Sequence, residues 1–279
     1  KPLLRVIEPY PILTPEQIEL AYWMQKNYFC LLVDALRLMI PAQMRGGKIK
    51  EKIERTIQLA NPVEVENQLA SLLDKSGKPR AQKQYEVLET LKTSGLEMAV
   101  SDVLAYVPGA QGAITALLKR GYLVEGGHVT FRRPNISALS ADKQVVLNAA
   151  QQSAVDEIAR AMDAKSGTLL LHGVTGSGKT EVYMHAIERC LAAGRQAIML
   201  VPEISLTPQT VGLFQERFSD GIAVLHSRLS AGERFDEWRR IRLGKARVAV
   251  GARSAVFAPM QNVGLIIVDE EHEGSYQSE

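Results

Sequence analysis

The sequence is poor in cysteine, with only Cys30 and Cys190, which lie far apart in the chain. Because they do not have C-x-x-C spacing, they indicate neither a zinc site nor a disulfide framework. Long apolar runs are missing too, since Asp34 and Arg37 interrupt the most apolar region. The first residues also do not have the pattern of a secretory signal peptide. We therefore expect a protein of a reducing cytosol with no membrane partner.

Neither sign of charge dominates, since 33 Lys and Arg residues against 31 Asp and Glu residues give a formal net charge of +2. This balance neither favours nor excludes a nucleic-acid partner. The length of 279 residues, of which 46% are hydrophobic and 23% charged, suits about two globular domains. The chain begins with Lys1 rather than methionine and ends at Glu279, shortly after an acidic cluster. We therefore expect a fragment truncated at both ends.

The clearest motif that is present is a glycine-rich loop matching the phosphate-binding pattern G-x-x-x-x-G-K-[ST]. The apolar run 168–172 predicts a strand before the loop, and residues 180–191 predict a helix after it. We expect Lys179 to contact the β- and γ-phosphates of ATP and the Thr180 hydroxyl to ligate Mg²⁺. A chance glycine-rich turn is the alternative. The expected ATP-binding loop consists of Gly173, Val174, Thr175, Gly176, Ser177, Gly178, Lys179 and Thr180.

An acidic motif follows a second apolar run. Residues 264–268 predict a strand buried on both faces, and Asp269, Glu270, Glu271 and His272 come directly after it. We expect Asp269 to hold Mg²⁺ and Glu270 to orient and deprotonate the attacking water. A solvated acidic loop is the alternative, but the phosphate-binding loop in the same chain favours a hydrolytic site. Lys179, Thr180, Asp269 and Glu270 are therefore the candidate catalytic residues.

From residue 145 the chain alternates between helical and strand patterns, which predicts an α/β fold with a parallel sheet and helices on both faces. A capping box at Ser230–Glu233 predicts the start of one of these helices, which should end at Gly244. In such a fold, sites lie at the carboxyl ends of the strands. We expect strands at 168–172, 196–201, 222–226, 246–250 and 264–269.

Residues 15–40 form a predicted helical region with a break near Cys30, opened by the capping signal of Thr14 to Gln17. An aromatic cluster in this region suits either base stacking or a core, and the pattern favours the core. We expect residues 47–76 to form a linker with helical parts. The aromatic residues of the cluster are Tyr22, Trp23, Tyr28 and Phe29.

Residues 77–135 predict a small winged-helix domain. Three helical patterns are followed by a hairpin, with strands at 122–124 and 129–133 and a turn at 125–127. In winged-helix proteins the third helix can enter the major groove of DNA. Here that helix carries few base-reading side chains, so contact with DNA and contact with protein both remain open.

Four blocks of sequence together resemble one family. The chain is similar to the PriA family of primosomal replication-restart helicases, which are superfamily-2 DNA helicases of bacteria. Phosphate-loop proteins in general lack the second and third of these blocks. The blocks are Gly173–Thr180, Val201–Ile204, Gly251–Phe257 and Asp269–His272.

The resemblance implies a domain plan. Residues 1–46 would be the end of a 3′ DNA-binding domain, 77–135 the winged helix, and 136–279 a RecA-like first helicase lobe truncated at its C-terminus. The second lobe and the zinc-binding cysteines of the family would lie outside this chain. ATP and Mg²⁺ are the implied cofactors, and zinc is expected only in the missing C-terminal part.

The resemblance also assigns roles to residues outside the phosphate-binding loop. Gln151 would contact the adenine of ATP, since an amide can bond N6 and N7 together; without the resemblance it is a solvated helix residue. Thr207, Arg253 and Ser254 would bind DNA phosphates, although Thr207 also suits a helix cap. The sequence departs from the family pattern at Ser205, where glycine is expected, and at Ala252, where threonine is expected.

We therefore expect an ATP-dependent DNA helicase of the primosome that restarts stalled forks. The implied partners are forked and single-stranded DNA, single-stranded DNA-binding protein and other primosome proteins, in the bacterial cytoplasm near the nucleoid. This fragment alone should bind ATP without unwinding DNA. One alternative is another superfamily-2 translocase, of the repair or restriction type. The other is a nucleotide-switched winged-helix DNA-binding protein without motor action.

Overall fold

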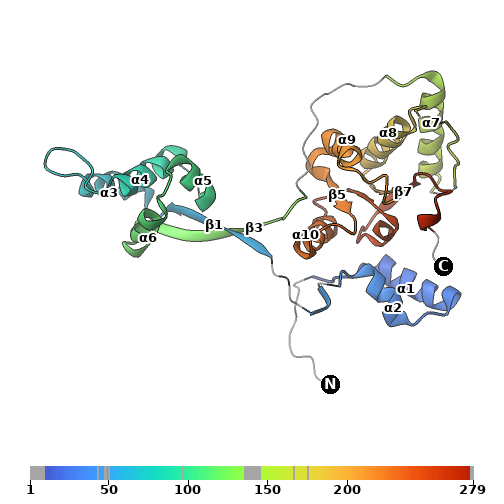
Figure 1. Cartoon of the computed structure of the whole chain (residues 1–279), viewed down its shortest axis with the longest axis horizontal. Coiled ribbons are helices and arrows are strands. Elements are labelled where there is room, and N and C mark those ends of the chain that lie inside the picture. Colours follow the sequence, from blue (N-terminus) through green and yellow to red (C-terminus); the bar gives the residue numbers. More distant parts are fainter. Residues whose placement is uncertain are drawn as a thin grey trace. The chain divides into compact units, whose positions relative to one another are not determined.

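A computed structural model describes residues 10–276 except 43, 47–48, 50, 96, 135–145, 166 and 175. The chain divides into two compact units (Figure 1). One unit combines residues 1–50 with 131–279, and the other consists of residues 51–130. No helix among the described residues is long and apolar enough to cross a membrane.

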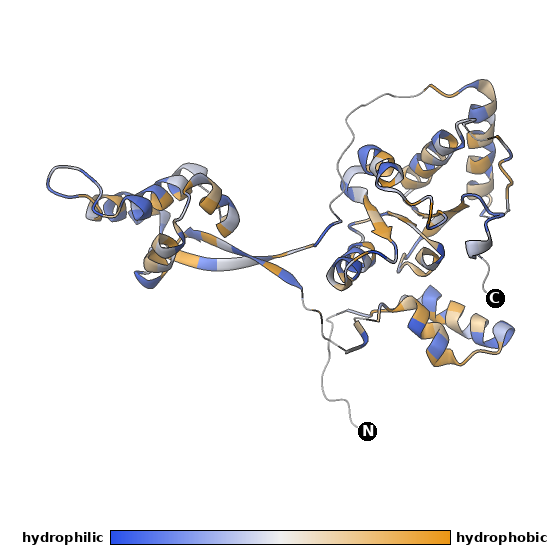
Figure 2. Cartoon of the chain, in the orientation of Figure 1, coloured by the Kyte–Doolittle hydropathy of each residue, from blue (hydrophilic) through white to orange (hydrophobic). Residues whose placement is uncertain are grey.

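The first unit contains the predicted parallel sheet. The strands β4, β5 and β6 are short apolar runs that are almost wholly buried, and β5 carries strongly hydrophobic residues in Figure 2. The prediction that the run 264–268 is buried on both faces is wrong, because β7 lies at the edge of the described sheet and Ile266 is 51% exposed. The strand order is β5-β6-β4-β7, and every neighbouring pair is parallel. The α/β fold with a parallel sheet is thereby confirmed. The strands are β4 (Gln196–Leu200), β5 (Ile222–Leu225), β6 (Val248–Gly251) and β7 (Val263–Val268).

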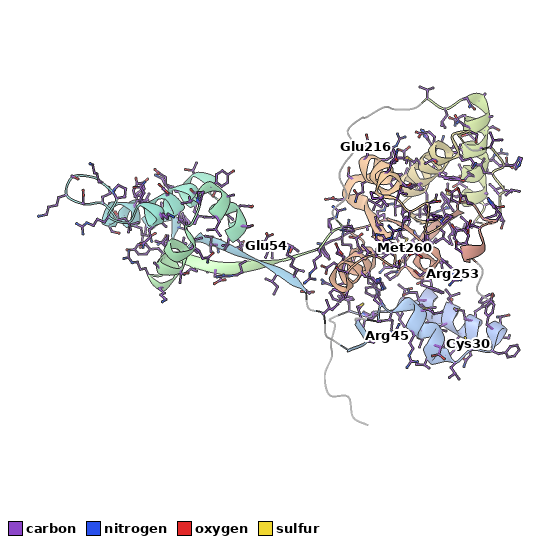
Figure 3. The ribbon with its side chains drawn as sticks, viewed as in Figure 1. Cys30, Arg45, Glu54, Glu216, Arg253 and Met260 are labelled. Carbon is purple, nitrogen blue, oxygen red and sulfur yellow. The ribbon has the colours of Figure 1, made fainter. Side chains whose placement is uncertain are left out.

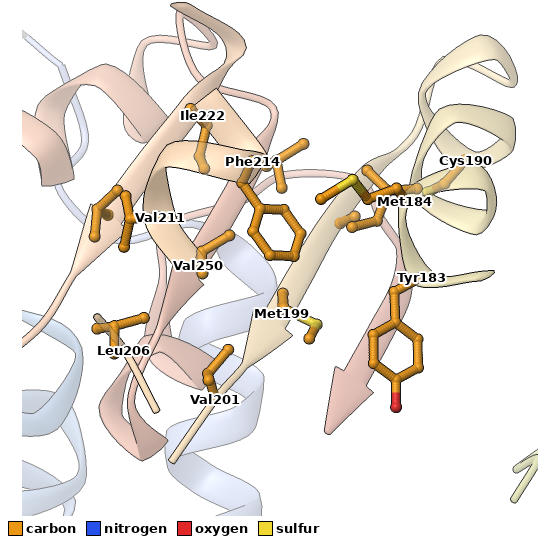
Figure 4. Packing of buried hydrophobic residues seen from close by; sticks show 14 of the residues in the cluster. Tyr183, Met184, Cys190, Met199, Val201, Leu206, Val211, Phe214, Ile222 and Val250 are labelled. Atoms are coloured by element: carbon orange, nitrogen blue, oxygen red, sulfur yellow. The ribbon is translucent and has the colours of Figure 1, made fainter. Parts of the chain in front are cut away.

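Helices alternate with these strands as predicted, and the buried residues form two main clusters around the sheet. Figure 4 shows the larger cluster, in which Phe214 packs among side chains from the strands and helices. The capping box at Ser230 is present. The helices are α7 (Ala149–Asp163), α8 (Lys179–Ala192), α9 (Pro208–Phe218) and α10 (Ala231–Arg242), with 3₁₀ turns η3 (Ser219–Gly221), η4 (Arg253–Phe257) and η5 (Gly274–Tyr276).

The strand predicted at 168–172 is not formed. Leu171 packs against the larger cluster, but Leu170 is 76% exposed, and the segment has no regular secondary structure. A strand requires ladder hydrogen bonds to a neighbour. Within the described part of the chain, no strand pairs with this segment.

Two helices near the start of the chain form a hairpin within the first unit, which we call the α1–α2 hairpin. Helix α1 (Pro15–Tyr28) begins with the predicted capping box at Thr14, and α2 (Leu32–Met39) follows the predicted break. A short turn, η1 (Met44–Gly46), comes next. The side chain of Trp238 on α10 donates a hydrogen bond to Met39 O at 3.2 Å, so the hairpin is held against the lobe.

The prediction that the aromatic cluster of this hairpin is buried is wrong. The buried residues of α1 are Gln17 and Ala21, and none of the large rings is among them. The four rings instead remain on the surface of the described structure. They are Tyr22 (56% exposed), Trp23 (52%), Tyr28 (66%) and Phe29 (94%).

The second unit differs from the predicted order of elements, because residues 52–59 form a strand rather than part of a linker. This strand, β1, pairs antiparallel along its whole length with β3. A core of apolar residues joins the strands to the helices. The elements are β1 (Lys52–Leu59), η2 (Pro62–Glu64), α3 (Val65–Ser71), α4 (Gln82–Ser94), β2 (Met98–Ala99), α5 (Val100–Tyr106), α6 (Gln111–Lys119) and β3 (Leu123–Thr130).

The hairpin predicted around residues 125–127 is therefore absent. Gly126 and Gly127 lie in the middle of β3, opposite Thr56 and Arg55. A Cβ on Gly127 would lie 2.7 Å from Ile53 Cγ2, so these glycines accommodate a close neighbour rather than a turn. The unit that contains the three predicted helices thus extends over 51–130 instead of 77–135.

Residues 131–133 belong to the first unit, not to a wing. The backbone N–H and the guanidinium of Arg132 both donate to Asp236 Oδ2, at 2.8 and 3.0 Å. Arg133 pairs with Asp220, and the ring of Phe131 lies 4.7 Å from Lys245 Nζ. These contacts hold the segment against α10, against η3 and against Lys245, which follows α10.

Candidate active site

The carboxyl ends of the four strands form one level row. Leu225 of β5 is in register with Gly251 of β6, Gly251 with Leu200 of β4, and Leu200 with Val268 of β7. The residues that follow these positions therefore emerge at one edge of the sheet. This edge brings together the three candidate segments that follow strands, around Thr207, Arg253 and Asp269.

The phosphate-binding loop has the backbone conformation that its glycines permit. Gly176 and Gly178 have φ of +79° and +81°, in the left-handed region, and Gly178 is the N-cap of α8. Among the described residues no side chain caps this helix end, so its first N–H groups remain available to an anion. The loop therefore fits a phosphate group. Thr175 lies outside the described residues.

Two side chains stabilise this loop. The Lys179 ammonium donates to Gly173 O at 2.7 Å and Val174 O at 3.2 Å. The Gln151 amide accepts a hydrogen bond from Asn148 N at 2.9 Å and donates one to Ser177 O at 3.1 Å. An amide has two donor and two acceptor positions. Among the described residues, these two hydrogen bonds use one acceptor and one donor position of Gln151 and leave one of each.

Asp269 is held between the sheet and two tyrosines. Its backbone N–H donates to Leu200 O at 2.9 Å, and its carbonyl accepts from the Tyr276 hydroxyl at 2.9 Å. Its carboxylate Oδ1 accepts from the Tyr183 hydroxyl at 3.1 Å. Among the described residues, Oδ2 has no hydrogen-bond partner. The carboxylate therefore retains an oxygen that fits Mg²⁺.

Tyr183 remains a hydrogen-bond donor throughout the ordinary pH range. Burial, and then the negative charge of Asp269, raise the pKa of the Tyr183 phenol well above its usual value. Glu270, by contrast, is exposed and has a φ of +49°, so it projects from the turn that follows Asp269. Thr180 is exposed as well. These positions suit a cation ligand and a base that meet solvent.

The DNA-binding candidates lie on the neighbouring loops. Thr207 is the N-cap of α9 and accepts a hydrogen bond from Thr210 N at 3.2 Å, so the helix-cap interpretation is confirmed. Arg253 and Ser254 are exposed at the start of η4 (Figure 3 labels Arg253).

A Cβ on Gly251 would lie 2.2 Å from Leu225 O, so the close approach of β5 requires glycine there.

The turn that carries Arg253 is anchored in the α1–α2 hairpin. Phe257, at the end of η4, packs against the small core of the hairpin around Ala21 and Met39. The buried side chain of Gln17 donates to Phe257 O at 3.0 Å. The two exposed candidate DNA contacts therefore lie on a turn with a fixed end.

Sequence reasoning missed two features of this edge. One is Tyr183, whose position on the helix after Lys179 was the only available signal. The other is the loop after β5, where His226 accepts from Arg228 N at 3.1 Å, and where burial lowers the pKa of His226. A pocket of about 250 Å³ lies between this loop and the loop after β4. Its lining includes Glu203, Leu206, His226, Arg228 and Glu233.

Known families match both ends of the chain. Residues 144–279 match the family described as type III restriction enzyme, res subunit. Residues 1–41 match the 3′ DNA-binding domain, where the sequence predicted the end of such a domain.

Several curated relatives share one description. Replication restart protein PriA of Bacillus subtilis is 40% identical over 83% of this chain and 29% of its own length. That of Haemophilus influenzae is 33% identical over the whole of this chain and 37% of its own length. That of Treponema pallidum is 50% identical over 53% of this chain. The chain thus spans about a third of the length of the relatives that cover most of it.

Proposed function

This chain is a homologue of replication restart protein PriA, and from that premise we propose that it binds and hydrolyses ATP within a DNA helicase that restarts stalled replication forks. It contains a match to a 3′ DNA-binding domain and a helicase domain. The observation that carries the proposal is the hydrogen bond between Tyr183 on the phosphate-loop helix and Asp269 at the end of β7. It joins the two motifs needed for ATP hydrolysis.

In the proposed reaction, the N–H groups at the start of α8 and the Lys179 ammonium bind the phosphates, and Gln151 binds adenine. Lys179 must leave the carbonyls of Gly173 and Val174 to do so. Thr180 and Asp269 would hold Mg²⁺, and that ion would neutralise charge on the phosphate oxygens. Glu270, exposed beside Asp269, orients the attacking water and accepts its proton.

The proposed DNA path runs along the same edge of the sheet. Arg253 and Ser254 bind backbone phosphates from the anchored turn after β6, and the N-terminus of α9 at Thr207 contributes a second phosphate contact. We include the unit of residues 51–130, which contains the three predicted helices without the predicted hairpin, as a second element that binds forked DNA. Arg132 and Arg133 are excluded from that role, because both are paired with aspartates of the lobe. The proposed substrates are single-stranded and forked DNA, and the proposed partners are single-stranded DNA-binding protein and primosome proteins.

The test is binding of Mg·ATP to this 279-residue chain, together with phosphate release with and without single-stranded DNA. We expect binding with slow turnover and no unwinding, because the resemblance places the facing lobe outside the chain. An arginine from a facing partner is worth about 10³–10⁵ in rate in related enzymes.

Lys179→Ala should abolish binding, whereas Lys26→Ala, which removes an exposed lysine on α1, should not change it. Equal ATP binding by both variants would refute the phosphate-loop assignment. Fast DNA-dependent turnover that Lys179→Ala abolishes would show that one lobe is sufficient.

A further inference from the structure

Tyr183 connects the phosphate-loop helix to the acidic motif. It lies one helical turn after Lys179, on the face of α8 that packs against the sheet, and it is only 8% exposed. Its ring belongs to the larger core cluster, and Figure 4 shows its hydroxyl pointing away from the other labelled side chains. That hydroxyl donates to Asp269 Oδ1 at 3.1 Å.

The other contacts of Asp269 fix its backbone and not its carboxylate. The bonds to Leu200 O and from the Tyr276 hydroxyl both involve main-chain atoms of Asp269. A carboxylate on such a backbone still rotates about χ1 and χ2. Within the described part of the chain, Tyr183 is the side chain that hydrogen-bonds the carboxylate, so it selects the rotamer.

We propose that Tyr183 is a positioning residue, which holds the Asp269 carboxylate so that Oδ2 is presented to the Mg²⁺ of bound Mg·ATP. The proposal rests on the proposed function, in which Asp269 ligates that ion. A buried ring within the core lets the hydroxyl keep one position without the entropy loss that a flexible side chain would incur. Tyr183 lies on α8, which begins at the phosphate-binding loop. One rigid helix therefore positions both the phosphate-binding groups and, through Tyr183, the Asp269 carboxylate.

The test separates ATP binding from cation binding. Affinity for ATP is measured by calorimetry in excess EDTA, and then as a function of Mg²⁺ concentration. For Tyr183→Phe we expect unchanged affinity in EDTA. We expect the Mg²⁺ concentration at half effect to rise by about tenfold, which corresponds to about 1.4 kcal/mol. Phenylalanine retains the ring, so the core packing is preserved.

Tyr276→Phe is the matched control, because it removes a hydroxyl bonded to the carbonyl of the same aspartate. It should leave the Mg²⁺ dependence unchanged. Asp269→Asn should raise the Mg²⁺ requirement, and Tyr183→Phe should have no additional effect in that background, since a positioning residue acts only through its partner.

Two results would overturn the proposal. One is an unchanged Mg²⁺ dependence in Tyr183→Phe. The other is an equal loss of affinity in EDTA and in Mg²⁺ together with a lower thermal midpoint, which would show a role in packing alone. Failure of the proposed function has a different signature. In that case the unmodified chain binds no ATP under either condition.

Discussion

Replacing Gly178 with alanine tests how closely the phosphate-binding loop is fitted to its surroundings. Gly178 has a φ of +81°, and a Cβ there would lie 2.4 Å from Gln151 Nε2. The left-handed backbone costs an L-residue about 1–2 kcal/mol. Displacement of Gln151 loses its hydrogen bond to Ser177, worth about 1 kcal/mol. Alanine at this position therefore raises the free energy of the native loop conformation by about 2–3 kcal/mol, and without ATP the loop of the variant adopts a different conformation.

ATP binding must restore the strained loop, so the affinity should fall by about 30- to 150-fold, at 1.4 kcal/mol for each tenfold. The assay is equilibrium binding of a fluorescent ATP analogue. Gly194→Ala is the control for backbone cost, because Gly194 has a φ of +75° and no atom near its Cβ position. It should bind ATP normally, with a modest loss of stability.

The steric part of the cost depends on Gln151. In a Gln151→Ala background, Gly178→Ala should therefore reduce affinity less than it does in the unmodified chain. Strictly additive effects would refute the collision with Gln151. Normal ATP binding by Gly178→Ala would refute the fitted loop altogether.

Four further changes test other parts of the molecule. Glu270→Gln should retain ATP binding and stop phosphate release, because the amide cannot accept the proton; lost ATP affinity with residual turnover would place the base elsewhere. Ser230→Ala should lower the free energy of unfolding by about 1 kcal/mol at pH 7, measured by urea denaturation, because the cap hydrogen bond from Glu233 N is lost. Ser230 also lowers the pKa of Glu233, so the part of the effect that depends on the Glu233 charge is complete above the ordinary carboxyl pKa and is lost as the pH falls through the lowered value; a difference that does not shrink at acidic pH would contradict that part. Phe257→Ala should destabilise the α1–α2 hairpin by about 3 kcal/mol, measured as faster proteolysis there than elsewhere, and uniform proteolysis would argue against the anchor. Removal of residues 51–130 should reduce the affinity for forked DNA, and the salt dependence of that affinity, more than it reduces the affinity for ATP. An unchanged affinity for forked DNA would indicate that this unit contacts protein instead.

Features that depend on neighbouring residues were predictable from the sequence. The capping boxes at Thr14 and Ser230 form as expected, because their hydrogen bonds join residues within one turn of helix. The apolar runs from residue 196 onward become parallel strands, and Asp269 falls at the end of β7. The loop before Lys179 likewise needs left-handed backbone at two positions, and the motif itself supplies glycines there.

Features that depend on a distant partner were decided only by the tertiary structure. The apolar run 168–172 has the composition of a strand but no ladder neighbour among the described residues. Gly126 and Gly127 are residues typical of a turn, but both pair with β1 and therefore lie within the strand β3.

The same distinction applies to the candidate site. The spacing of each motif identified Lys179 and Asp269 separately. Nothing in either motif indicates that Tyr183 on α8 hydrogen-bonds Asp269 at the end of β7. Likewise, the anchoring of the Arg253 turn by Gln17 joins residues from opposite ends of the chain. Sequence therefore determined which chemical groups this protein has and the local conformations that hold them, because hydrogen bonds within a turn or a helix depend on adjacent residues. Only the tertiary structure decided which of these groups meet, because pairing between distant segments depends on the packing of the whole lobe.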